Sequence, residues 1–119
     1  MIKKTEPKYL ALVEFVAEAL RKVQIGFDEY QKECFVSRPS EFFCLELNGE
    51  AGELANIEKK VWKGKEIPHE KFESEAADVL IALMNYCNAK DVNLGQAVSD
   101  KLQQIEQKRL ALKQNNEEY

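Results

Sequence analysis

The sequence predicts an all-α protein with an antiparallel four-helix-bundle core and one short extra helix. Its apolar residues recur with the period of about 3.6 residues that a helix requires, and no segment alternates convincingly as a strand would. Clear breaks are few: Gly26, SRPS at 37–40, KGKEIPH at 63–69 and DVN at 91–93. Because the links between the long helices are short, consecutive helices are expected to pack antiparallel.

Three helices are expected in the first half of the chain. The first spans residues 7–23 and carries a wide apolar face, and a short second helix, FDEYQKECF, follows Gly26. The third begins after Ser40, which is a favourable N-cap because its hydroxyl can accept from a free backbone N–H. It ends near residue 63, where Gly64 supplies the C-terminal stop.

Two more helices are expected in the second half. Pro68 suits a first helical turn, because its fixed φ is helical and its missing N–H has no partner there anyway, and it opens a helix that runs to about Lys90. Asn93 is the expected N-cap of the last helix, which continues to about Lys113. Gln96 follows three residues later, as in a capping box.

Composition and charge describe one globular domain over residues 1–119, with 45% hydrophobic and 32% charged residues. The net charge of −4 argues against a partner that is a nucleic-acid polymer, since such binders usually carry a basic excess. No apolar run approaches the roughly 20 residues that cross a membrane, and no secretion signal is evident, so a cytoplasmic protein with no membrane partner is expected. A core of this size is modest, and self-association would supplement it.

Three carboxylates lie on the face that the third expected helix should bury. Glu46, Glu50 and Glu53 stand at i, i+4 and i+7, in or on the edge of the sector of the helical wheel that holds the apolar residues Phe43, Leu54, Ile57 and Val61. An ionised carboxylate removed from water costs several kcal/mol unless another group compensates it. Three such residues on one stripe therefore indicate a site rather than a surface.

The fourth expected helix repeats this pattern. Glu75 and Asp78 stand at i and i+3 on the flank of its apolar stripe, so antiparallel packing would bring them to Glu50 and Glu53. Four carboxylates without histidine are a ligand set for Mg²⁺, with Mn²⁺ as a substitute. The alternative is that these acids are solvated or paired with a basic residue one turn away. Glu46 is then either an acid just outside the metal ligands or the partner of a cation.

The order of these motifs resembles the MazG-like superfamily of all-α nucleoside triphosphate pyrophosphohydrolases, in its short phage and bacterial form. The family pattern is E-x-x-E on one helix and E-x-x-D on the next, here EAGE and EAAD. The similar segments are GEAGELANIEKK, ESEAADVLIALMNY and KLQQIEQKR. The resemblance covers about residues 27–109. It leaves an N-terminal helix at about 7–24 without a counterpart and a tail at about 114–119 that is expected to fray.

The resemblance implies hydrolysis of a nucleoside triphosphate, NTP or dNTP, to the monophosphate and pyrophosphate, as in nucleotide-pool house-cleaning. It implies a homodimer or a dimer of dimers, and Mg²⁺ held by Glu50, Glu53, Glu75 and Asp78. Glu53 or Glu46 would take the proton of the attacking water. Many members carry an acid where this chain has Gly49, and Glu46 is the candidate to replace it.

Five residues are candidate substrate contacts. Lys60 lies on the edge of the acid-bearing stripe, about two turns beyond Glu53, and would neutralise charge on the leaving pyrophosphate. Lys101 and Arg109 resemble the basic ending of the family pattern. Trp62 would stack on a base and Gln31 would hydrogen-bond to its edge. The alternatives are solvated surface cations for the basic residues and core packing for the aromatic one.

Other classes of protein share parts of this pattern. A non-catalytic helical oligomerisation module that binds a nucleotide or a metal would have the same helices, and a regulator that binds a nucleotide without hydrolysis would keep the same acids. A ferritin-type di-iron bundle needs E-x-x-H on two helices, whereas the single histidine of this chain, His69, lies in an expected loop.

Overall fold

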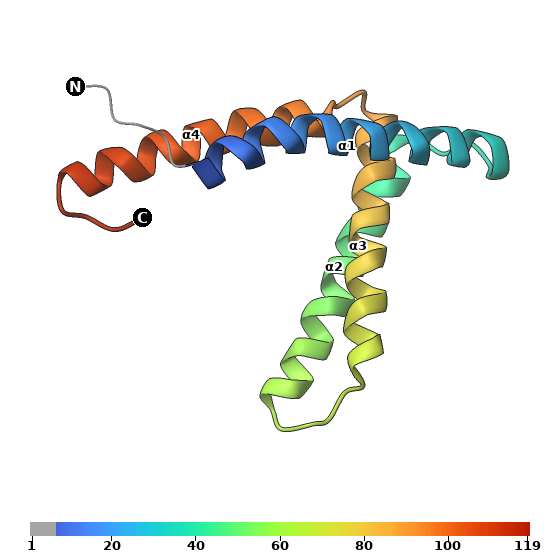
Figure 1. Ribbon diagram of the computed structural model, residues 1–119. Coiled ribbons are helices and arrows are strands. Elements are labelled where there is room, and N and C mark those ends of the chain that lie inside the picture. The colour runs from blue at the N-terminus through green and yellow to red at the C-terminus, as the bar shows by residue number, and fades with distance from the viewer. Residues whose placement is uncertain (1–6) are drawn as a thin grey trace. The chain divides into compact units, whose positions relative to one another are not determined.

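The computed structural model describes residues 7–119 as four α-helices joined by short links (Figure 1). The helices are α1 (Pro7–Cys34), α2 (Ser40–Trp62), α3 (His69–Ala89) and α4 (Leu94–Gln114). The described residues contain no strand, so the predicted all-α class is confirmed. Within the same residues, no helix is long and apolar enough to cross a membrane.

The predicted short helix after Gly26 is not a separate element. Helix α1 continues through this glycine to Cys34, so the prediction of a fifth, extra helix was wrong. A glycine inside a helix costs only about 1 kcal/mol relative to alanine, and the good helix formers on both sides outweigh that cost. A Cβ placed on Gly26 would meet nothing within 4 Å, so no neighbour requires a glycine there.

The other helix ends lie within a residue or two of their predicted positions. Gly64 adopts a φ of 95° after the end of α2, the left-handed conformation that ends many helices. Asn93 caps α4, and its side-chain oxygen accepts from the backbone N–H of Gln96 at 3.2 Å. Ser40 is not an N-cap. It is the first residue of α2, and its hydroxyl donates to the Glu41 carboxylate at 3.1 Å.

The helices form two compact units. One unit is Gln24–Val92, which holds the end of α1 with α2 and α3, and the other holds α1 up to Val23 with Asn93–Tyr119. In the first unit α2 and α3 run antiparallel and side by side, joined by a short loop (Figure 1). In the second, the first half of α1 lies along α4 (Figure 1). The four predicted long helices therefore pack as two pairs.

The core of the Gln24–Val92 unit is small and lies between α2 and α3. Its buried apolar side chains come from both helices: Phe43, Ile57, Ala82, Met84 and Cys87. Such packing of facing apolar stripes is the main source of stability for an antiparallel helix pair. Because Met84 is completely buried, this core is centred on the last half of α3.

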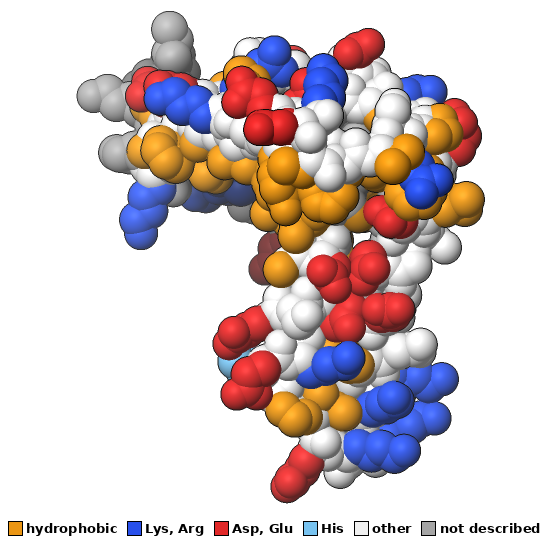
Figure 2. Space-filling model, turned by 90° about the vertical axis from the view of Figure 1, so that its right-hand side faces the viewer, with side chains coloured by type: hydrophobic (Ala, Val, Ile, Leu, Met, Phe, Trp, Pro, Cys, Tyr) orange, Lys and Arg blue, Asp and Glu red, His pale blue; other side chains and the backbone are white. Residues whose placement is uncertain are grey.

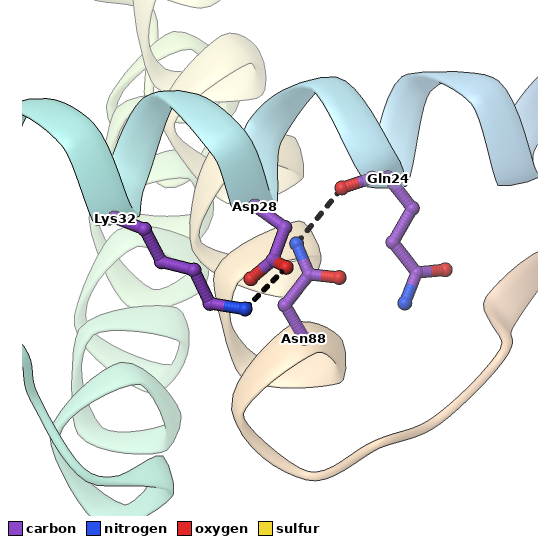
Figure 3. Close-up of polar contacts among 4 residues, drawn as sticks. All are labelled: Gln24, Asp28, Lys32 and Asn88. Carbon is purple, nitrogen blue, oxygen red and sulfur yellow. Dashed lines mark hydrogen bonds and ion pairs between the residues drawn. The ribbon is translucent and has the colours of Figure 1, made fainter.

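Two polar contacts attach the end of α1 to the end of α3. The Gln24 side chain is buried, and its amide donates to the backbone oxygen of Val92 at 2.5 Å. Asn88 of α3 donates to the backbone oxygen of Gln24 at 3.0 Å (Figure 3). A turn further along α1, Lys32 pairs with Asp28 at 2.8 Å (Figure 3). The two contacts of Gln24 hold this end of α1 against the hairpin that carries the acids.

The α1–α4 pair depends on close backbone contact. A Cβ placed on Gly95, in the first turn of α4, would lie 2.4 Å from the backbone oxygen of Ala17. Only glycine fits at such a distance. Further along α4 the buried Glu106 accepts from Arg109 at 2.5 Å, and this hydrogen bond lowers the pKa of the Glu106 carboxyl.

We expect Met84→Ala to lower the free energy of unfolding by about 2–5 kcal/mol, because truncation of a fully buried side chain leaves a cavity. Trp62→Ala is the control, since this side chain is 86% exposed, and its effect should stay within about 0.5 kcal/mol. Urea unfolding followed by circular dichroism measures both. Equal losses would contradict the core described above.

Candidate metal centre

Four carboxylates gather where α2 and α3 face each other. Glu50 and Glu53 come from α2, and Glu75 and Asp78 come from α3. One oxygen each of Glu50, Glu75 and Asp78 lie within 4.8 Å of one another. Figure 2 shows acidic side chains together on this helix pair, with basic side chains nearer its looped end. We call the four residues the acid cluster.

Helix geometry explains why these residues meet. Residues three apart on a helix share a face, so each of the two motifs presents both of its acids in one direction. The antiparallel pairing of α2 with α3 then turns the two acidic faces toward each other. Three of the four acids predicted to converge, Glu50, Glu75 and Asp78, therefore bring carboxylate oxygens together in the fold.

The acid cluster contains buried oxygen atoms without hydrogen-bond partners. Glu75 is only 5% exposed, and its Oε2 and the Oε2 of Glu50 are the two such side-chain atoms among the described residues. A buried polar atom left unpaired costs about 1–3 kcal/mol, and more if it is charged. A divalent cation would supply the missing partner of both oxygens. Carboxylate oxygens suit Mg²⁺ or Mn²⁺, so the residues present fit a metal.

Burial and repulsion from neighbouring carboxylates make Glu50 a weaker acid than an ordinary glutamate. Loss of solvent around its carboxyl raises the pKa of Glu50, and the negative charges of the acid cluster and of Glu46 raise it further. In the metal-free protein, desolvation and the neighbouring charges therefore both oppose ionisation of Glu50. A cation bound beside Glu50 would instead favour the ionised form of its carboxyl group.

Glu53 differs from the other three acids. Its side chain is exposed, and it is outside the group of three oxygens that lie within 4.8 Å. A hydrogen bond with the Glu75 carboxyl raises the pKa of Glu53, and the negative charge of Glu75 adds to this effect. Glu53 is therefore the acid of the cluster that is best placed to accept a proton from solvent.

Lys71 is a basic residue at the acid cluster that the sequence analysis did not select. Its Nζ lies 3.5 Å from Oε1 of Glu75, one helical turn further along α3. The positive charge of Lys71 also lowers the pKa of Glu53, against the larger effects that raise it. The i, i+4 spacing of Lys71 and Glu75 was a signal that could have identified this cation.

Three of the predicted substrate residues lie in the same compact unit as the acid cluster. Lys60 and Trp62 are exposed near the end of α2. Gln31 of α1 lines a cleft of about 300 Å³ together with Arg38 and Asn85. A second cleft of about 430 Å³ is lined by Gln31 and also by Glu46.

The other two predicted substrate residues belong to the unit that contains α4. Lys101 donates to Gln104 at 3.4 Å, on the surface of its own helix. Arg109 donates to Glu106, as described above. Both basic residues therefore contact side chains of α4 itself.

Fold and site define an all-α protein of four helices with an acidic cluster that could hold a metal ion. No model of a known protein family matches the chain, and neither a curated protein nor a solved structure matches it. A function for this chain must therefore be inferred from its own residues.

In the absence of metal, we expect Glu50→Gln to raise the melting temperature by a few degrees at pH 7.5. The raised pKa of Glu50 means that the folded protein binds this proton more tightly than the unfolded chain. The contribution of Glu50 to folding stability is therefore present at low pH and is lost as the pH rises through its folded pKa. Above that pH the folded protein should be more stable with an uncharged glutamine at this position. The advantage should disappear near pH 4.

Excess Mn²⁺ should reverse the order of stability. It should raise the melting temperature of the unmodified protein and leave that of Glu50→Gln unchanged, because a ligand that binds the folded state stabilises it. Glu58→Gln, an exposed residue of α2 with the same change in charge, is the matched control. Thermal unfolding in EDTA and in Mn²⁺ measures these shifts. A Mn²⁺ shift in Glu50→Gln as large as in the control would contradict the site.

Proposed function

We propose that the protein is a metal-dependent nucleoside triphosphate pyrophosphohydrolase of the MazG-like type. The observation that carries this proposal is the convergence of Glu50, Glu75 and Asp78. Two of these residues, Glu50 and Glu75, each have a buried carboxylate oxygen without a hydrogen-bond partner. A cluster that costs stability in the metal-free protein is typical of functional sites. The reaction would be hydrolysis of NTP or dNTP to (d)NMP and pyrophosphate, within cytoplasmic nucleotide-pool house-cleaning.

The proposed cofactor is Mg²⁺, with Mn²⁺ as a substitute, held by Glu50, Glu75 and Asp78 with Glu53 beside them. Mg²⁺ bound through carboxylates keeps positions for water and phosphate oxygens. When bound, it would neutralise charge on the triphosphate and lower the pKa of a bound water. The acid cluster would hold the positive charge of the Mg²⁺ beside the linkage between the α and β phosphates.

Glu53 is the proposed general base. Its carboxylate is exposed and lies outside the group of three oxygens that would hold the metal, so it stays available to accept a proton. Its carboxylate would take one proton from the attacking water. The water oxygen would form a new bond to phosphorus, and the bond to the bridging oxygen would break and release pyrophosphate. Glu46, also exposed and one turn before Glu50, is the alternative base.

The proposed nucleoside contacts lie in the two clefts lined by Gln31. Their volumes of about 300 and 430 Å³ lie at the lower end of the range for small-molecule sites. The larger cleft also includes Glu46, whose charge acts on Glu50, so it lies next to the acid cluster. Gln31 would hydrogen-bond to a base edge there. Lys60 and Trp62, which lie in the same compact unit, remain proposed contacts of the phosphates and the base.

A homo-oligomer, either a dimer or a dimer of dimers, is the proposed assembly. Large apolar side chains are widely exposed, including Phe15 at 71% and Leu45 at 73%. Figure 2 shows many hydrophobic side chains exposed on one face of the protein. Extensive exposed apolar surface is unusual in a monomer and marks interaction sites. These exposed side chains also favour the alternative function, a non-catalytic oligomerisation module that binds a nucleotide or a metal.

Pyrophosphate release from a panel of canonical and modified (d)NTPs tests the proposed reaction. We expect release that requires Mg²⁺ or Mn²⁺ and stops in EDTA, with the monophosphate formed in equal amount. We expect Glu53→Gln to lower turnover by about 100-fold or more, as for the loss of a general base, with an unchanged helical circular dichroism spectrum. Metal binding without pyrophosphate release across the panel would instead favour the non-catalytic module.

Light scattering coupled to gel filtration tests the assembly. We expect a mass of at least twice the 13.7 kDa of one chain. Phe15→Glu should lower that mass, because it places a charge in the exposed apolar surface of α1. Lys22→Glu, an exposed residue of the same helix, is the control. A monomer at a concentration of about 100 μM, well above the Kd of a stable interface, would contradict the proposal.

A further inference from the structure

We propose that Lys71 is the internal counter-ion of the acid cluster in the metal-free protein, and that its ammonium binds a substrate phosphate once a divalent cation occupies the cluster. This inference rests on the proposed function. It adds a substrate contact that neither the motifs nor the resemblance indicated.

The ion pair of Lys71 joins a buried acid to a solvent-accessible cation. Its Nζ lies 3.5 Å from Oε1 of Glu75, whose side chain is almost completely buried, while the Lys71 side chain is 57% exposed. A well-formed charge-assisted hydrogen bond is shorter, at about 2.7–2.9 Å. The contact is therefore a loose pairing of charges, which another cation can replace without breaking a strong hydrogen bond.

Lys71 acts on both helices of the acid cluster. It contacts Glu75 of its own helix, and its charge favours ionisation of Glu53 on α2. Glu73, the neighbouring acid on α3, pairs with His69 at 3.4 Å, so it has a different partner. The ammonium of Lys71 is thus directed to Glu75 of the proposed metal site rather than to Glu73.

A divalent cation at the acid cluster would change what surrounds Lys71. The carboxylates would then be neutralised, and the ammonium would be repelled by the bound cation instead of attracted by free acids. The long, flexible Lys71 side chain can move away while its charge stays at the rim of the cluster. Phosphate oxygens of a metal-bound triphosphate would lie at that rim, and lysine is a suitable point charge for phosphate.

Three variants and two titrations test this inference. The variants are Lys71→Met, Lys71→Arg and Lys90→Met, the last an exposed residue beyond the other end of α3 with the same change in net charge. Calorimetry first measures Mn²⁺ binding to metal-free protein, and then inorganic pyrophosphate binding to Mn²⁺-saturated protein. Lys71→Met should bind Mn²⁺ about three- to tenfold more tightly and pyrophosphate about tenfold more weakly than Lys90→Met. Lys71→Arg should retain pyrophosphate binding.

The outcomes separate this inference from the proposed function. Equal Mn²⁺ affinity in Lys71→Met and Lys90→Met would overturn the counter-ion role. Tighter Mn²⁺ binding with unchanged pyrophosphate binding would overturn the phosphate contact. Absence of Mn²⁺ binding in the unmodified protein would refute the proposed function itself, and this inference with it.

Discussion

The antiparallel pairing of α2 with α3 is the constraint on which the site depends. A loop of six residues joins the two helices, with the left-handed Gly64 after α2 and Pro68 immediately before α3. This hairpin buries Ile57 and Met84 on facing stripes, and the same alignment brings the acids of the two motifs together. Packing and site are therefore consequences of a single arrangement. Any change that shifts one helix along the other would disturb both.

In this arrangement apolar packing stabilises the hairpin, whereas repulsion between the carboxylates destabilises it. The buried apolar core is small, and the adjoining carboxylates repel one another and leave two buried oxygens unpaired. Lys71 offsets part of the negative charge, but through a long contact to one acid. Helix α1 also stabilises the hairpin, because its Gln24 is hydrogen-bonded to Val92 and Asn88. The hairpin is thus stabilised from α1 while the acid cluster keeps its capacity for a cation.

Local signals in the sequence explain which parts of the structure were predictable. Gly64 marks a helix end through its left-handed backbone, and Asn93 marks one through a side-chain hydrogen bond to the backbone. Both features are local, so they could be identified without knowledge of the fold. Gly26 was misleading, because a glycine ends a helix only when its surroundings favour the break. The helical wheel placed the acids on one face, but a wheel gives direction and not depth. It therefore could not show that Glu75 is buried while Glu53 is exposed, or that Lys71 contacts the cluster.

The four acids have different environments, which the proposed hydrolase would use for different tasks. Glu50, Glu75 and Asp78 bring their oxygens within 4.8 Å of one another, so this group could hold a metal ion. Glu53 contributes no oxygen to that group, remains exposed and has a raised pKa because of its hydrogen bond to Glu75. In the proposed hydrolase, such an acid would take the proton of the attacking water.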